Sequence, residues 1–132
     1  MDINWRAVLY GLLTSIVLGI LSGLAVPYTD LSLPVLGAGL TGLIAGAVAG
    51  YYNNRSTTSD ATAGALATII GALVIAVILT VVGTLLAGIF GLGLGLGLIV
   101  LVVVAGIPGA VGGLVGGYLH RGREDRVGRP AA

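Results

Sequence analysis

The sequence predicts an all-α polytopic membrane protein with four transmembrane helices. Of its 132 residues, 57% are hydrophobic and a further 24 are Gly, whereas only 8% are charged, against about 25% in a soluble domain. The charges divide the chain into long uncharged intervals, and small residues recur at helical spacing in each interval. A soluble fold of this length must cover itself with polar surface. We therefore expect the lipid bilayer to surround it.

The uncharged intervals define the spans. Between Arg6 and Asp30 lie 23 uncharged residues, and between Asp30 and Arg55 lie 24. Each interval is long enough to cross a hydrocarbon core of roughly 30 Å as a helix. The interval from Ala61 to His120 has 60 residues, which is room for two spans with a connection or, tightly, three.

The arginines decide between two and three spans in that last interval. With two, all six Arg lie on one face of the membrane, whereas three would place four of them on the other face, against the positive-inside tendency. We therefore expect a multi-pass protein of the cell membrane with both termini in the cytoplasm. The residues that determine this topology are Arg6, Arg55, Arg121, Arg123, Arg126 and Arg129.

Helices are expected over residues 5–26, 34–52, 61–90 and 96–119, within a transmembrane domain of residues 1–120. Pro27 and Pro34 bracket the first outer turn, because Pro ends one helix and begins another. The alternating Gly and Leu of residues 91–97 predict the second outer connection, since Gly has high backbone entropy and little helix propensity. Residues 121–132 are expected to form a disordered, Arg-rich cytoplasmic tail.

Two segments favour an internal duplication. With an offset of 67, residues 39–51 align with residues 106–118 at six identical positions of thirteen, and both segments end in Gly-Tyr. Each unit would contain two spans, so the two halves would have the same orientation in the membrane. We expect a parallel repeat of a two-helix unit.

Small residues spaced by four predict a helix-packing groove on every span, because residues at this spacing lie on one helix face. Such grooves let helix backbones approach closely in lipid, where van der Waals contact replaces the hydrophobic drive. Whether these grooves mate within one chain or between chains is left open by the spacing. The predicted packing residues are Gly11, Ser15, Gly19, Gly23, Gly42, Gly46, Gly50, Ala72, Ala76, Thr80, Thr84, Gly88, Gly109, Gly113 and Gly117.

Several function classes are excluded by the residues that are missing. The chain has no Cys and one His, so we expect no metal site and no thiol chemistry. The predicted spans hold no ionisable residue for a proton relay and no paired carboxylates for acid–base work. We therefore expect no catalytic residues, no cofactor and no enzyme activity. A net charge of +1 argues against a nucleic-acid partner.

The residues also resemble a known family. The opening Asn4-Trp5-Arg6-Ala7-Val8 and the Gly-rich segments 39–51 and 109–118 look like those of small four-span haloarchaeal membrane proteins of unknown function. This resemblance implies a cell membrane in a high-salt archaeon, and it implies no activity. The charges in the second loop and in the tail depart from the short polar linkers of that family.

The leading hypothesis is a non-enzymatic, glycine-packed helical bundle that acts through self-assembly or a membrane-protein partner. The alternative is a small transporter or channel for a neutral or apolar solute, since Ser and Thr side chains could line a polar path. The Arg-rich face could also attract anionic lipids.

Overall fold

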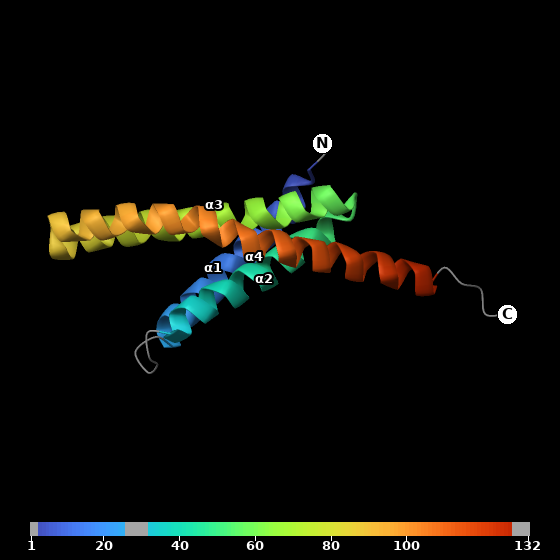
Figure 1. Cartoon of the computed structure of the whole chain (residues 1–132), viewed down its shortest axis with the longest axis horizontal. Coiled ribbons are helices and arrows are strands. Elements are labelled where there is room, and N and C mark those ends of the chain that lie inside the picture. Colours follow the sequence, from blue (N-terminus) through green and yellow to red (C-terminus); the bar gives the residue numbers. More distant parts are fainter. Residues whose placement is uncertain (1–2, 26–31, 128–132) are drawn as a thin grey trace.

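Four α-helices make up the computed structural model, which describes residues 3–25 and 32–127. α1 (Trp5–Ala25) pairs with α2 (Ser32–Asn53), and α3 (Thr57–Ala87) pairs with α4 (Ile89–Val127), as Figure 1 shows. The all-α class is confirmed. α3 and α4 are each long and apolar enough to cross a membrane.

The two helix pairs cross and then separate. α4 lies against both α2 and α3, and α1 lies against α2 and α3. Neighbours along the chain run antiparallel, whereas α2 and α4 run parallel, because Gly46 faces Gly109 and Gly50 faces Gly113. Away from the C-terminus the pairs diverge, and the α3–α4 hairpin reaches further than the α1–α2 pair (Figure 1). The segments of the proposed duplication, 39–51 and 106–118, thus lie side by side in the same direction.

Local chemistry explains the ends of α3. The hydroxyl of Ser56 accepts a hydrogen bond of 3.2 Å from the backbone N–H of Ser59, which is an N-cap. Asp60 follows in the first turn, where a negative charge is favoured by the helix dipole. At the other end, Gly88 has φ +59° and donates its N–H to the carbonyl of Thr84 at 2.9 Å. Residues with a Cβ rarely adopt this φ, so Gly closes the helix.

Two sequence predictions about α4 are wrong. Residues 91–97, predicted as a connection, are helical, and the turn is instead at Gly88. A non-helical segment would leave backbone groups without partners in an apolar environment, and a Cβ at Gly91 would strike the backbone of Gly83. The predicted disordered tail from residue 121 is helical to Val127, while residues 128–132 lie outside the described residues.

The predicted helix bounds also differ from the structure by several residues. α3 begins at Thr57 and not at residue 61, and α4 covers Ile89–Val127 in place of residues 96–119. The earlier start of α3 brings Asp60 into a helix. Its place in the first turn of α3 positions Asp60 in the site described below.

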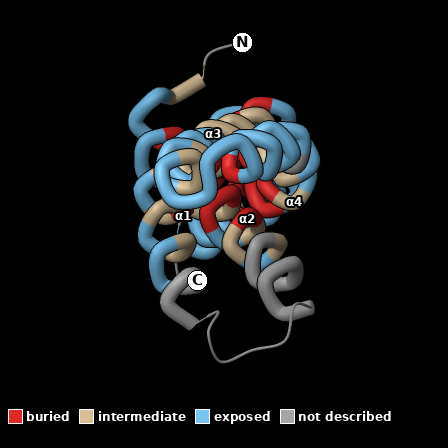
Figure 2. Tube along the Cα trace, turned by 90° about the vertical axis from the view of Figure 1, so that its left-hand side faces the viewer, coloured by how far each residue is buried: buried red, intermediate tan, exposed pale blue. Residues whose placement is uncertain are grey.

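Small residues occupy the centre of the bundle, which Figure 2 shows as buried trace surrounded by exposed trace. Ala45, Ala49, Ala63 and Ala67 are fully buried. Large side chains such as Leu, Ile and Val point outward from α1, α3 and α4. The interior is therefore built from close backbone approach and not from large apolar side chains.

Candidate functional site at the charged end

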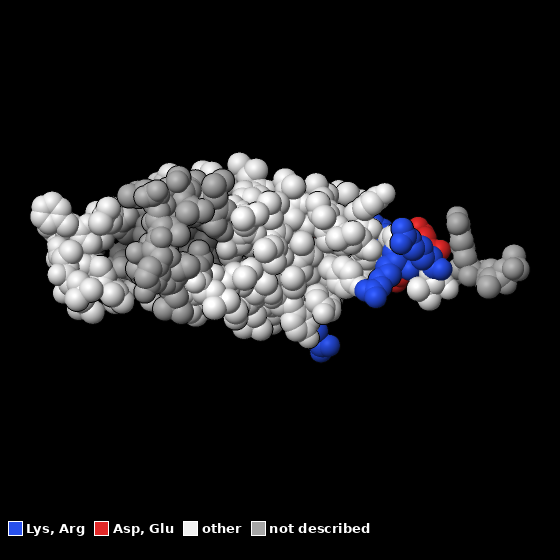
Figure 3. Space-filling view, turned by 90° about the horizontal axis from the view of Figure 1, so that it is seen from below, with Lys and Arg blue, Asp and Glu red and all other residues white. Residues whose placement is uncertain are grey.

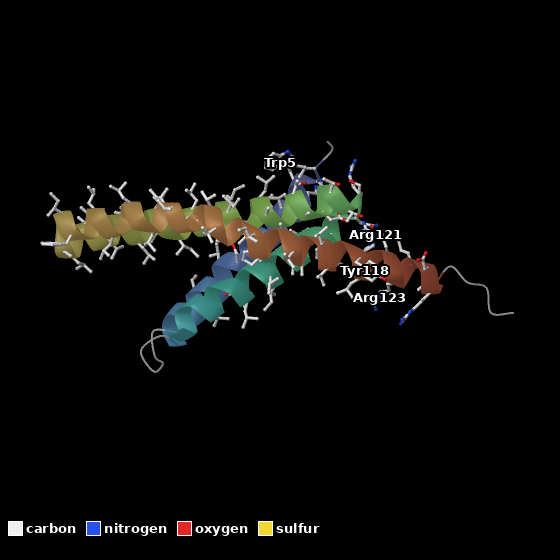
Figure 4. All side chains as sticks on the ribbon, in the orientation of Figure 1. Trp5, Tyr118, Arg121 and Arg123 are labelled. Atoms are coloured by element: carbon white, nitrogen blue, oxygen red, sulfur yellow. The ribbon has the colours of Figure 1, made fainter. Side chains whose placement is uncertain are left out.

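A buried ion pair joins the start of α3 to the end of α4. The Asp60 carboxylate is 0% exposed, and its Oδ2 lies 2.6 Å from Nη1 of Arg121, whose side chain is one-third exposed. A buried carboxylate needs both a counter-charge and hydrogen bonds to offset the loss of water. Figure 4 shows Arg121 on the side of α4 that faces α3.

Hydrogen bonds extend this pair to the other two helices. Nδ2 of Asn53 donates to Oδ1 of Asp60 and to Oγ of Ser59, both at 2.9 Å. The backbone N–H of Arg55 donates to the same Oδ1 at 3.3 Å. The backbone N–H of Asn4, which precedes α1, donates to Oδ1 of Asn53 at 3.0 Å. We call Asn4, Asn53, Ser59, Asp60 and Arg121 the Asp60 cluster.

Glycines in α4 make the space that this cluster needs. A Cβ on Gly117 would strike the carboxylate of Asp60, and a Cβ on Gly113 would strike the carbonyl of Asp60. The carboxylate therefore fits only because α4 lacks side chains at this level. Gly113 and Gly117 were predicted to be packing residues, and the structure places both against α3.

Most of the other predicted packing residues also lie between helices of this one chain, but the prediction is wrong for Gly88, which lies in the turn with nothing within 4 Å of its Cβ position. A Cβ on Gly46 would strike Gly109, and a Cβ on Gly50 would strike Gly113. Gly11 lies against Ala45, Ala49 and Ala67. Gly42 lies beside Thr68 and Pro108. Ser15 meets Gly71, Gly19 meets Ile75, and Thr80 meets Gly95. Ala76 is buried, Ala72 and Thr84 are partly buried, and Gly88 forms the turn. The surroundings of Gly23 lie outside the described residues.

Charged side chains gather at one end of the molecule. In Figure 3 the visible Arg, Asp and Glu side chains lie toward the C-terminal end, and none is visible toward the opposite end of this face. Arg6, Arg55, Arg121, Arg123 and Arg126 all belong to this charged end, as the predicted topology requires, while Arg129 lies outside the described residues. The described residues contain no group of three or more His, Cys, Asp or Glu that could hold a metal ion.

Aromatic rings form a second feature of the charged end. Tyr51 lies 4.5 Å from the ring of His120 and 5.6 Å from that of Tyr52, which in turn lies 5.0 Å from Tyr10. Nε2 of His120 lies 3.6 Å from a carboxylate oxygen of Glu124. Rings of this kind are frequent at the level of lipid headgroups.

An open groove of about 710 Å³ lies next to these rings, between α2 and the last turns of α4. We call it the tyrosine–arginine groove. It is lined by Tyr51, Tyr118, Leu119, Gly122, Arg123, Asp125 and Arg126.

Comparison of the chain with known protein families gives one match. The family model described as Family of unknown function (DUF5518) matches residues 5–119. The chain belongs to the DUF5518 family. This match confirms the expected membership of a family of unknown function. No curated protein matches the chain, and no solved structure matches it.

The DUF5518 match covers some residues of the site and not others. It includes Asn53, Ser59 and Asp60, together with the glycines of the helix contacts. Arg121 and the arginines of the tyrosine–arginine groove lie beyond its last residue.

Sequence reasoning missed the Asp60 cluster. The expected helix over residues 61–90 leaves Asp60 just outside it, and Arg121 is expected only to determine topology. The usable signal was the N-cap pattern Ser56-Thr57-Thr58-Ser59-Asp60, which places the start of α3 before the carboxylate.

Proposed function

We propose that this protein is a non-enzymatic integral membrane protein that acts by assembling with itself or with a membrane-protein partner. The observation that carries this proposal is the distribution of side chains between the interior and the surface. Among the described residues, the interior holds mostly Ala, Gly, Ser and Thr together with Asn53 and the charged Asp60, whereas most Leu, Ile, Val and Phe side chains are exposed, Val8 and Val102 being buried exceptions.

This distribution is the reverse of that in a water-soluble bundle. Ala63 and Ala67 are fully buried, while Leu86 and Phe90 are at least 80% exposed. Burying apolar surface contributes about 25 cal/mol per Å² in water, so these side chains would be costly to leave in water. In lipid there is no such cost, and close contact of small residues stabilises the bundle.

The charged end supports the predicted orientation. Five arginines of the described chain lie at this end, and arginines are enriched on the cytoplasmic side of membrane proteins. The proposal therefore places both termini in the cytoplasm and the turn at Gly88 on the opposite side. A haloarchaeal cell membrane is the setting that the sequence resemblance implies.

The α3–α4 hairpin supports assembly as the mode of action. At 31 residues, α3 is about 46 Å long, which exceeds a hydrocarbon core of roughly 30 Å. Beyond the crossing, the hairpin exposes Leu85, Leu86, Ile89 and Phe90 near its turn. A Cβ on Gly93 or Gly97 would meet nothing within 4 Å. This stretch of α4 thus offers a surface that a further helix can approach closely.

The hydroxyl groups favour assembly over transport. Thr68, Thr80 and Thr84 donate to backbone carbonyls one turn earlier, at 2.6 to 2.9 Å. Ser15 donates to Leu12 at 2.8 Å. These hydroxyls are used within the helices, so they supply little polarity to a solute path.

Two measurements test the proposal. Membranes from expressing cells are washed with alkaline carbonate, and the protein is expected to stay in the pellet; its release would overturn the membrane assignment. Native mass spectrometry from mild detergent then tests assembly, with Gly93→Leu plus Gly97→Leu as the variant and Gly39→Leu, whose Cβ position is also open, as the control. Assembly predicts an oligomer or a co-purifying membrane protein that only the double variant loses. A monomer alone in the unmodified protein would overturn it.

A further inference from the structure

We propose that the tyrosine–arginine groove binds the phosphate headgroup of an anionic membrane lipid. The inference rests on the proposed membrane location and adds a specific partner to it. Three properties of the groove support it, namely its position beside the apolar surface, its two arginines and its open volume.

The groove lies at the boundary between the apolar surface and the charged end. Tyr118 and Leu119 form its apolar wall, and Arg123 and Arg126 form its charged wall further along α4, at a distance of one to two turns. Residues spaced by three or four lie on one helix face, so these side chains follow one another along the helix axis. A lipid has the same order, with acyl chains on one side of its phosphate and water on the other.

The two arginines are available to a ligand. Within the described residues, neither Arg123 nor Arg126 makes an ion pair or a side-chain hydrogen bond, whereas Arg121 is committed to Asp60. Figure 4 shows Arg123 on the side of α4 opposite to Arg121. Guanidinium groups bind phosphate oxygens through paired, charge-assisted hydrogen bonds. Asp125 also lines the groove, so its net charge is +1, which suits a phosphodiester with one negative charge.

Gly122 leaves the groove open. A Cβ at this position would meet nothing within 4 Å, and Gly122 is one of the lining residues. The volume of about 710 Å³ lies within the range of roughly 300 to 1,000 Å³ that small-molecule sites occupy. The aromatic side of the groove, formed by Tyr51 and Tyr118, supplies hydroxyl donors at the level where headgroups lie.

The test places the full chain in nanodiscs, releases the protein from them in the mass spectrometer, and measures by native mass spectrometry which lipids stay bound to it. The probe is phosphatidylglycerol, with phosphatidylcholine as the zwitterionic comparison. Retained phosphatidylglycerol is expected to exceed phosphatidylcholine, and Arg123→Gln plus Arg126→Gln is expected to reduce its affinity roughly 25-fold, at about fivefold per arginine. Arg6→Gln plus Arg55→Gln removes the same charge at the same end outside the groove, and it should leave the affinity within about twofold.

A second variant separates shape from charge. Gly122→Leu fills the groove without changing any charge, and it should reduce phosphatidylglycerol retention at least fivefold, whereas Gly122→Ala should have little effect. Glycerol phosphate at millimolar concentration should not displace the lipid, because it lacks acyl chains for the apolar wall. Its effective competition would show a phosphate site and not a lipid site.

Four results would overturn the inference. They are displacement of the lipid by glycerol phosphate, equal retention of both lipids, equal loss with the groove and control arginine variants, and unchanged retention in Gly122→Leu. Carbonate washing of the same variants distinguishes failure of the lipid-binding inference from failure of the proposed membrane location. A protein that stays in the membrane but shows no lipid preference contradicts the groove alone, whereas a protein that leaves the membrane contradicts both.

Discussion

The Asp60 carboxylate and the Arg121 guanidinium lie 2.6 Å apart although 61 residues separate them in the chain. The pair connects the first turn of α3 to the last turns of α4. Through Asn53 and Asn4 the same network reaches the end of α2 and the start of α1. One buried carboxylate therefore holds together the cytoplasmic ends proposed for all four helices.

Removing Arg121 should destabilise the bundle strongly. Arg121→Gln leaves the fully buried Asp60 without its counter-charge, and loss of one partner of a buried pair costs about 3 kcal/mol or more. Unfolding in detergent micelles, followed by circular dichroism against added denaturing detergent, measures the change. Arg123→Gln is the matched control and should change stability by less than about 0.5 kcal/mol. If Asp60→Asn combined with Arg121→Gln is no more stable than Arg121→Gln alone, the unpaired charge is not the cause.

A methyl group at Gly113 should also be destabilising. Its Cβ would strike the backbone of Asp60 and lie 3.1 Å from Cα of Gly64, and neither backbone can move without shifting a helix. Overpacking of this kind costs about 1 to 3 kcal/mol. Gly39→Ala is the control, because a Cβ there would meet nothing within 4 Å and Ala favours a helix by about 0.5 to 1 kcal/mol over Gly. Opposite shifts in the thermal midpoint are expected, and a stabilised Gly113→Ala would show that the helices do not approach this closely.

The turn at Gly88 should depend on its backbone conformation. Gly88→Ala forces a side chain onto φ +59° and ψ −134°, outside the left-handed helical region, at a cost of about 1 to 3 kcal/mol, although a Cβ there would meet no other atom. Gly88→Asn should cost less, since φ +59° with ψ −134° is close to the first central residue of a type II′ turn, where Asn is tolerated better than Ala. The order Gly, Asn, Ala in midpoint is the expected result. Equal midpoints for all three would mean that the turn does not use this conformation.

Cysteine labelling tests the orientation. In a chain with no Cys, Thr58→Cys at the charged end should react with an impermeant maleimide only after the membrane is opened. Thr29→Cys, between α1 and α2 in the sequence, should react in intact cells or spheroplasts, because the proposed orientation puts that connection outside. The reversed pattern would invert the topology, and labelling of both sites from one side would contradict a full crossing by α2.

Much of the fold could be predicted because spacing alone decides which residues share a helix face. Gly46, Gly50, Gly109 and Gly113 were identified by their period of four, and the structure places them opposite one another. Propensity misled at residues 91–97, where Gly suggested a break. There Gly91 and Gly95 face Gly83 and Thr80, so the absence of side chains serves helix contact.

The candidate site was less predictable because its two charges lie far apart in the chain. Counting charges treats Asp60 and Arg121 as markers of membrane boundaries, and nothing in their spacing shows that they meet. The register between α3 and α4 brings them together, and that register depends on where the chain turns. With the turn predicted within residues 91–97 and not at Gly88, the pairing could not be derived.

The separation of Asp60 and Arg121 along the chain also has a consequence for folding during synthesis. Chains are made from the N-terminus, so α1, α2 and α3 exist with their buried carboxylate before its counter-charge has been synthesised. Until Arg121 is made, burial of Asp60 among the first three helices would have no counter-charge to offset the loss of water. A chain that stops short of Arg121 would have an uncompensated carboxylate at the charged end of the bundle, so the ends of its first three helices would be held together less tightly.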